Sequence, residues 1–325
     1  LVLDLSAQRE IEYVEYDLAN GIHVILHQEA STPIVAVSVL YHVGSKNENP
    51  DKTGFAHFFE HLLFEGSQHI DRGEYDELVE NNGGTLNANT SQDRTYYFET
   101  FPSNKLELGL WLESERMLHP VIDQVGVDTQ NEVVKEEKRQ RYDAPYGKLL
   151  KVLNENLFKV HPYKDQNIGK MEHLDAATLE EFMAYHKTYY GPNNAVLIVA
   201  GDIDTEETIE LVKKYFDEVP RGNEVVRNFP KEEPITENIR AKAYDKNIQI
   251  PMLLSSFRTP GFASRDSYVL DMISTYLSSG KSSVLYKKLV DDQKQALQTQ
   301  VINLGQVDYN IFAILALPLG EVSLD

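Results

Sequence analysis

Residues 54–64 read Gly-Phe-Ala-His-Phe-Phe-Glu-His-Leu-Leu-Phe, and the rest of the chain is best interpreted outward from this stretch. At about 100° per residue of an α-helix, His57 and His61 lie roughly 40° apart on one face. Glu60 lies on the same side, about 60° from His57, and the phenylalanines and leucines between them cluster on the opposite face. The pattern predicts a helix with one polar face and one face buried in a core.

The polar face of this helix has the spacing of a metal site. Two imidazoles at positions i and i+4 can bind one Zn²⁺ at about 2.0–2.1 Å, and a carboxylate between them can reach a water molecule beside the ion. A single histidine here would be read as a core or capping residue, but the pair with Glu60 favours a metal. The chain has no cysteine, so His, Asp and Glu are the available ligands.

A catalytic zinc needs a third protein ligand, and the helix predicted over 127–142 offers candidates. Glu132, Glu136 and Glu137 all lie on it, and each could instead belong to a solvated face with ion pairs to nearby lysines. Glu136 and Glu137 point about 100° apart, so both cannot face one ion. Spacing alone leaves the choice among the three open.

Periodicity and turn residues predict the remaining elements. An Asn-Gly turn at 20–21 joins the first two strands as a hairpin. The predicted strands are 11–16, 22–27, 34–41, 85–90, 95–101, 195–200, 248–257 and 311–317, and the predicted helices are 54–64, 74–81, 106–118, 127–142, 146–158, 176–189, 205–216, 265–277 and 283–290.

The chain is long enough for two packing units, since 325 residues with 42% hydrophobic content exceed what one core usually serves. Residues 220–246 combine several prolines with dense charge and little periodicity, which is typical of a linker. We expect an α+β fold, with a mainly antiparallel sheet flanked by helices in each of two similar domains. The expected division is a catalytic zinc-binding domain over 1–220, a linker over 221–246 and a smaller, incomplete second domain over 247–325.

Charge and hydropathy exclude other classes of protein. The net charge of −20 repels phosphate backbones, which argues against nucleic acid as a partner and favours cationic ligands. No run of 18 apolar residues is present, so no membrane span is expected. The sequence opens at Leu1 without a leader, as a mature exported protein would, so we expect the periplasm of a Gram-negative bacterium, with the cytoplasm as the alternative.

Several motifs together resemble one known family. The segment His57-Phe-Phe-Glu60-His61 is followed by Gly-Gly-Thr-Leu-Asn-Ala-Asn-Thr at 83–90, Asn-Glu-Val-Val-Lys-Glu-Glu at 131–137, His-Pro-Tyr at 161–163 and Tyr-Gly-Pro-Asn-Asn-Ala at 190–195. In this order they resemble the pitrilysin and mitochondrial-processing-peptidase family, the M16 peptidases or inverzincins. Residues 280–286, Gly-Lys-Ser-Ser-Val-Leu-Tyr, are similar to part of that family's second, inactive domain.

The resemblance implies roles for particular residues. It implies that His57, His61 and Glu137 bind one zinc ion and that Glu60 is the general base. In the family a glutamate usually stands seven residues before the third ligand, where this chain has Gln130. Gln130 can still hydrogen-bond behind the ligands, but it supplies no negative charge.

The resemblance also implies a place for the substrate. In related enzymes the strand after the Gly-Gly turn holds an extended peptide by β-addition, which here means Leu86, Asn87, Ala88 and Asn89. Without the resemblance, these residues would be an ordinary edge strand with solvated side chains.

The function that follows is a zinc-dependent endopeptidase acting on extended or unfolded peptides. The alternative is a non-catalytic scaffold or peptide-binding subunit of a heterodimer, since the family contains such partners. A closed chamber of two homologous halves implies a further M16 domain, either in a homo- or heterodimer or in a C-terminal portion outside this sequence. The remaining histidines without metal spacing are expected in loops, caps or packing positions, namely His69, His119, His161, His173 and His186.

Overall fold

The computed structural model describes residues 11–320 and residue 322, whose helices and strands gather into two compact units. The first unit comprises the chain up to Glu136 together with 167–228, and the second comprises 137–166 and the chain from Phe229 onward. The boundary falls inside one continuous helix, α4 (Gln124–Asp143). Of the predicted domain ranges, residues 1–10, 321 and 323–325 lie outside the described residues, and the division at 221–246 stays a prediction.

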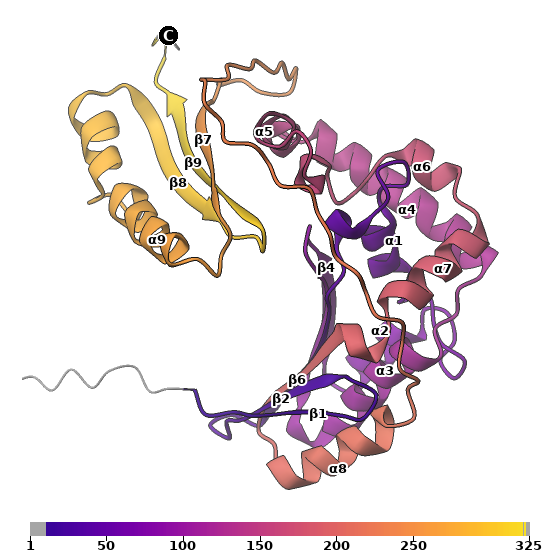
Figure 1. The fold of residues 1–325 in the computed structure, drawn as a ribbon. Coiled ribbons are helices and arrows are strands. Elements are labelled where there is room, and N and C mark those ends of the chain that lie inside the picture. Colours follow the sequence, from indigo (N-terminus) through magenta and orange to yellow (C-terminus); the bar gives the residue numbers. More distant parts are fainter. Residues whose placement is uncertain (1–10, 321, 323–325) are drawn as a thin grey trace, which may run out of the picture. The chain divides into compact units, whose positions relative to one another are not determined.

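The first unit contains a six-stranded sheet in the order β1-β2-β6-β3-β5-β4 (Figure 1). Neighbouring strands pair antiparallel except β2 and β6, which are parallel. The predicted hairpin at Asn20-Gly21 is present, and Gly21 has the positive φ of 94° that such a turn requires. The strands are β1 (Val14–Asp17), β2 (His23–Gln28), β3 (Ile34–Tyr41), β4 (Thr85–Thr90), β5 (Thr95–Pro102) and β6 (Ala195–Gly201).

Alternation along the strands decides which face of this sheet is buried. In β5 the residues Thr95, Tyr97, Glu99 and Phe101 are buried, while the residues between them are half-buried. Helices α1, α3 and α8 pack against the strands and build the main core with them (Figure 1). The helices of this unit are α1 (Phe55–Leu62), α2 (Glu74–Asn81), α3 (Leu106–Leu118), α6 (Met171–Asp175), α7 (Leu179–Tyr189) and α8 (Thr205–Phe216), with 3-10 turns η1 (Ser45–Asn47), η2 (Ser103–Lys105) and η4 (Pro192–Asn194).

The second unit is built on a three-stranded antiparallel sheet in the order β7-β9-β8. Helix α9 packs along β8, and α5 packs against β7 beside a small core that includes Phe158 and Ile311 (Figure 1). The elements are α5 (Leu149–Leu157), η3 (Pro162–Lys164), β7 (Leu253–Pro260), α9 (Arg265–Ser278), a π-type helical segment η5 (Tyr286–Asp292), β8 (Ala296–Leu304) and β9 (Tyr309–Pro318). The prediction of an α+β fold with mainly antiparallel sheets is confirmed.

Two predicted helices begin later in the structure, the strand predicted over 248–257 is found at Leu253–Pro260, and one further strand was not predicted. The helix predicted over 176–189 begins only at Leu179, because a capping box starts it there: the Thr178 hydroxyl oxygen accepts a hydrogen bond from the Glu181 amide, and the Glu181 carboxylate accepts one from the Thr178 amide. The helix predicted from 146 begins at Leu149, since Tyr146 has a positive φ of 62°. Strand β8 was not predicted, because its Gln and Thr residues and a bulge after Ala296 disrupt the alternation.

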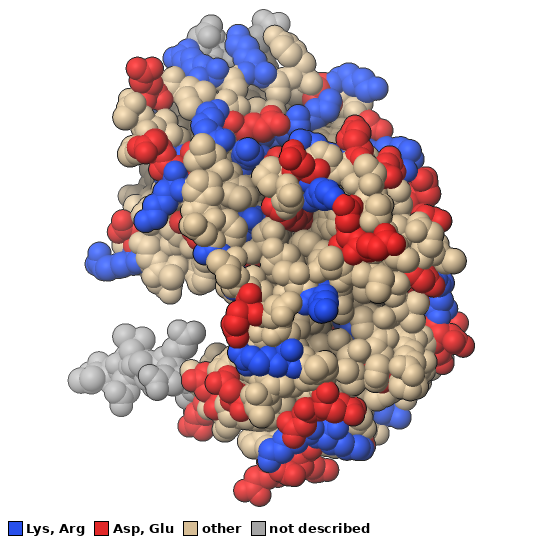
Figure 2. Space-filling model, turned by 45° about the vertical axis from the view of Figure 1, so that its right-hand side comes forward, with Lys and Arg blue, Asp and Glu red and all other residues tan. Residues whose placement is uncertain are grey.

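Figure 2 shows Asp and Glu side chains spread over the visible face and mixed with Lys and Arg. Among the described residues, no helix is both long enough and apolar enough to cross a membrane.

Candidate active site

Helix α1 carries the histidine pair, and its first turn is fixed by a buried carboxylate. Glu48 accepts hydrogen bonds from the backbone amides of Gly54 (2.7 Å) and Ala56 (2.8 Å). These amides belong to the unsatisfied start of the helix, where negative charge is favoured. Gly54 is required at this place because its φ is 101° and a Cβ there would lie 3.1 Å from the Ile168 carbonyl oxygen.

The apolar face of α1 orients the polar face. Phe55 and Phe58 stack on Phe182 of α7 with ring centroids 4.7 Å apart in both pairs. The Tyr97 hydroxyl donates to the Phe59 carbonyl oxygen at 2.8 Å. At the end of the helix the buried Arg116 donates to the Leu63 carbonyl oxygen at 2.8 Å. Contacts at both ends and along one side therefore hold α1 in a single rotation.

The predicted metal ligands lie together. One ligand atom from each of His57, His61 and Glu137 lies within 4.8 Å of the other two. The rings of His57 and His61 are 4.9 Å apart between centroids and nearly perpendicular. Glu137 lies on α4, where Arg141, one turn further on, donates to its Oε1 at 2.7 Å. His57 is buried, and His61 and Glu137 are half-buried.

Glu60 and His61 open onto a pocket of about 370 Å³. The Oε2 atom of Glu60 is buried and has no hydrogen-bond partner among the described residues. A buried carboxylate oxygen without a protein partner is costly unless a ligand or water molecule completes its bonding. The pocket is lined by Glu60, His61, Phe64, Asp76, Leu86, Asn87 and Ala88.

Strand β4 forms the edge of the sheet beside this pocket. The Ala88 amide donates to the side-chain oxygen of Asn87 at 2.8 Å, a bond within the edge strand itself. The Asn89 side chain instead accepts from Arg94 at 2.6 Å, and Asn89 is not among the pocket-lining residues. Of the four predicted substrate-binding residues, three line the pocket and Asn89 does not.

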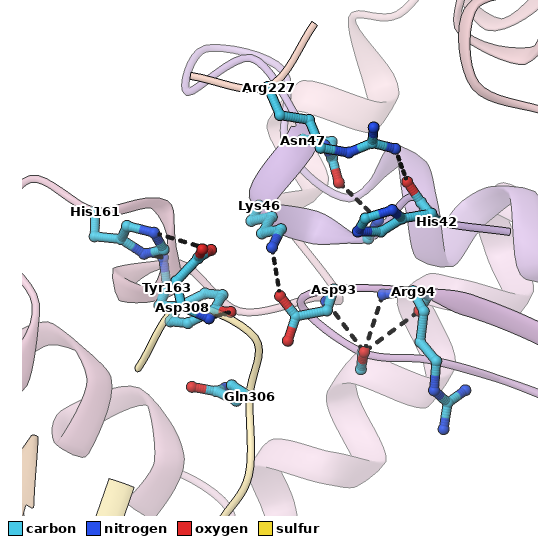
Figure 3. Close-up of polar contacts among 12 residues, drawn as sticks. His42, Lys46, Asn47, Asp93, Arg94, His161, Tyr163, Arg227, Gln306 and Asp308 are labelled. Atoms are coloured by element: carbon cyan, nitrogen blue, oxygen red, sulfur yellow. Dashed lines mark hydrogen bonds and ion pairs between the residues drawn. The ribbon is translucent and has the colours of Figure 1, made fainter. Parts of the chain in front are cut away.

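The turn that joins β4 to β5 is held by polar contacts (Figure 3). The Ser91 hydroxyl oxygen accepts from the backbone amides of Asp93 and Arg94, both at 3.1 Å. Asp93 forms an ion pair with the buried Lys46 at 2.8 Å. The Lys46 amide donates to the Gln92 carbonyl oxygen at 3.0 Å. These bonds fix the end of the edge strand.

Gln130 is bonded to the chain that follows α1. Its side-chain amide donates to Glu65 Oε1 at 2.5 Å, and Glu65 also forms an ion pair with Arg72. Arg72 reaches Asp123 at 3.0 Å, and Asp123 in turn accepts from the Gly126 amide at 2.7 Å in the first turn of α4. Gln130 is thus one member of a network that ties α4 to the end of α1.

His186, in the last turn of α7, has a packing role. Burial lowers its pKa to about 4, so its imidazole is neutral at pH 7. It stacks on Tyr190 with ring centroids 5.4 Å apart and lies 5.9 Å from Phe59. His186 therefore adds no positive charge behind the histidine pair.

Comparisons with known proteins identify the family. Residues 23–170 match the family model "Insulinase (Peptidase family M16)", and residues 176–319 match "Peptidase M16 inactive domain". The chain is 33% identical over 303 residues to the zinc protease PqqE of Helicobacter pylori, an alignment that covers 92% of this chain and 68% of that protein. The chain belongs to peptidase family M16. The resemblance drawn from the sequence motifs is confirmed.

Solved M16 structures share the fold. A protease from Helicobacter pylori superposes with a TM-score of 0.89 at 31% identity, covering 96% of this chain and 76% of that one. The periplasmic protease PqqL of Escherichia coli gives a TM-score of 0.78 at 21% identity, covering 96% of this chain and 36% of that one. The chain is also 28% identical over 290 residues to an uncharacterized zinc protease of Mycobacterium leprae. That alignment covers 87% of this chain and 64% of the length of that protein.

Sequence reasoning did not find every residue of this M16 site. Arg141 had a usable signal, because it stands four residues after Glu137 on one helix face. Phe64 and Asp76 gave no signal, since they reach the pocket through the packing of separate elements. The capping role of Glu48 likewise depends on a loop conformation that no local pattern specifies.

Proposed function

We propose that this chain is a zinc-dependent endopeptidase that hydrolyses extended or unfolded peptides. The observation that carries the proposal is the grouping of His57, His61 and Glu137 ligand atoms within 4.8 Å, with Glu60 beside them. Relatives named zinc proteases support a peptidase role.

The donor set suits zinc. Two imidazoles and one carboxylate are the protein ligands of a common type of catalytic zinc site, which keeps a fourth position for water or substrate. Bound there, zinc supplies a Lewis acid that lowers the pKa of water and polarises a peptide carbonyl. The Arg141 guanidinium, bonded to one Glu137 oxygen, restricts the orientation of that carboxylate.

Glu60 is proposed as the general base. In this proposal its buried Oε2 takes the proton of the attacking water and then returns it to the leaving amine. Leu86, Asn87 and Ala88 are proposed to hold the peptide as an added strand along the free edge of β4, so that its carbonyl is presented to the site. Asn89, the next residue of β4, is proposed to contact the peptide through its backbone only, because its side chain is bonded to Arg94.

The partner and compartment are further parts of the proposal. A second M16 domain, from a dimer partner or a further part of the protein, would complete a chamber around the substrate. The periplasm is proposed as the compartment, and the neighbour PqqL is named a periplasmic protease.

Glu60→Gln tests the chemistry with a conservative change. We expect the variant to keep its zinc and to lose at least about 100-fold in kcat/KM on an unstructured peptide, because Gln cannot take a proton. Zinc content is measured by elemental analysis and cleavage by mass spectrometry of the products. If the chain is instead a non-catalytic scaffold, the wild type and the Glu60→Gln variant should show the same background level of cleavage.

A matched pair of variants tests the third ligand. Glu137→Ala should lose zinc, whereas Glu136→Ala, its neighbour on α4 pointing about 100° away, should retain it. Equal zinc loss from both variants, or zinc retention by both, would contradict the assignment of Glu137 as the third ligand. Neither outcome bears on Glu60, which the Glu60→Gln variant tests.

A further inference from the structure

A second group of potential metal ligands lies outside the site described above. His69, Glu115 and His119 each place one ligand atom within 4.8 Å of the other two. His69 Nδ1 lies 3.0 Å from both carboxylate oxygens of Glu115, and His119 Nδ1 lies 3.3 Å from Glu115 Oε1. The rings are 5.3 Å apart between centroids and perpendicular. Each of the two imidazoles therefore directs its Nδ1 atom toward the Glu115 carboxylate.

The backbone holds the two histidines in place across about fifty residues of sequence. His69 lies in the turn after α1, and His119 directly follows α3. The Gln68 amide donates to the His119 carbonyl oxygen at 2.9 Å, and the Val121 amide donates to Gly66 at 3.1 Å. These bonds make a short antiparallel bridge, so the ligand positions are set before any ion arrives.

Glu115 is the buried member of the group and is held from behind. Its side chain is 8% exposed, and its Oε2 accepts from the Ser67 hydroxyl at 2.7 Å. This bond from Ser67 holds the Glu115 carboxylate in one orientation, with its oxygens directed toward the two imidazoles.

The N–O distances in this group are compatible with a coordination shell. Ligands at about 2.0–2.1 Å from a tetrahedral zinc ion are roughly 3.3 Å from one another. The observed N–O separations of 3.0 and 3.3 Å match that spacing, so an ion could replace the shared protons with little movement. His69 is 53% exposed and His119 29%, which leaves an approach from solvent. The C-terminus of α3 also favours positive charge.

We propose that His69, Glu115 and His119 form a second divalent-metal site that takes Zn²⁺, separate from the His57–His61–Glu137 group. Solvent completes the coordination. The ion links the turn after α1 to the end of α3 and so stabilises the chain next to the helix that carries Glu60. Two imidazoles and a carboxylate also suit Co²⁺ and Ni²⁺, which serve as probes.

The test counts zinc ions in matched variants. Metal-free protein is dialysed against micromolar zinc, and bound zinc per chain is measured by elemental analysis. The wild type should bind two ions, His69→Ala/His119→Ala one, His57→Ala/His61→Ala one, and the fourfold variant none. His23→Ala is the control: His23 contacts Asp17 and Glu15 but belongs to neither of the three-ligand groups found within the described part of the chain, so the variant should keep both ions.

Two outcomes overturn the proposal. Either the His57→Ala/His61→Ala variant binds no zinc, or His69→Ala/His119→Ala binds as much as the wild type. Circular dichroism checks the fold of each variant. If His69→Ala/His119→Ala does not fold, Glu115→Gln replaces it, since Gln keeps an acceptor for the Ser67 hydroxyl and loses the charge. Cobalt absorption of the His57→Ala/His61→Ala variant gives a readout that does not depend on peptide cleavage, so failure here leaves the proposed function untouched.

Discussion

At the scale of single residues, the buried Arg116 bonds the end of α1 through the Leu63 carbonyl oxygen. Its side chain is 1% exposed and bonds Glu113 at 3.1 Å, with Glu99 at 3.6 Å. Rings of Phe64, Tyr75 and Tyr97 surround the guanidinium with their centroids between 4.4 and 4.7 Å away. Desolvation, then the neighbouring charge of Glu113, raises the pKa of Glu99. Removing the cation would leave two buried acids without it.

We therefore predict that Arg116→Met lowers the free energy of unfolding of the first unit by about 3–5 kcal/mol. Urea unfolding followed by the fluorescence of Trp111, the single tryptophan, measures this on α3 itself. The triple variant with Glu99→Gln and Glu113→Gln should recover part of the loss. Arg221→Met is the control, because Arg221 pairs with Glu224 at the exposed surface and should cost under about 1 kcal/mol. A loss that small at Arg116 would contradict the prediction.

The candidate site shows which residues a sequence can identify. His57, Glu60 and His61 were found because helical spacing alone puts them on one face. His69 and His119 were expected in loops or packing positions, and they were missed as a group because a bridge between distant segments brings them to Glu115. Local periodicity carries no information about such a bridge.

At the scale of elements, the segment predicted as a linker is anchored at Glu232. One oxygen of Glu232 accepts from the backbone amides of residues 159–161 at 2.6–2.7 Å, and the other pairs with Arg258 at 3.1 Å. Its side chain is 3% exposed. Desolvation raises its pKa, but the three amides and Arg258 lower it overall. Residues 229–233 therefore belong to the packing of the second unit.

We predict that Glu232→Gln weakens hydrogen-exchange protection of amides 159–161 by about 2–3 kcal/mol. The folded pKa is depressed, so the stabilisation is present above the unfolded value of about 4.3 and is lost as pH falls through the folded value. The difference between wild type and variant should thus be largest at pH 7 and shrink below about pH 4. Glu233→Gln is the control, since only its backbone carbonyl contacts Arg258. An unchanged difference down to pH 2 would reject the role of the charge.

The elements themselves were largely predictable where one pattern acts alone. Helix α2 and strands β3 and β4 have the predicted bounds, because turn residues and a clear period delimit them. Strand β8 was missed because its polar residues resemble those of a loop. Its extended conformation is stabilised by antiparallel pairing with β9, which the local sequence does not specify. The β2–β6 pairing joins segments more than 160 residues apart, which no local pattern specifies.

At the scale of the whole molecule, the net charge of −20 bears on which peptides reach the pocket. Helix α2 carries four acidic and no basic residues, and its Asp76 lines the pocket. The local and overall charge have the same sign, so a basic peptide should be attracted and an acidic one repelled. Such long-range attraction falls as the screening length shortens from about 30 Å at 0.01 M salt to about 10 Å at 0.1 M.

We predict that the Glu60→Gln variant, chosen because the proposed mechanism gives it no peptide cleavage, binds a lysine-flanked peptide about tenfold more tightly than its glutamate-flanked twin at 0.01 M salt. The ratio should fall toward one at 0.3 M, as measured by fluorescence anisotropy with a glutamine-flanked peptide as reference. Adding Asp76→Asn should reduce the ratio, whereas Glu206→Gln on the distant α8 should not, because only the first lies at the pocket. A ratio that stays constant with salt would assign the preference to direct contacts, and a preference for the acidic peptide would exclude electrostatic attraction altogether.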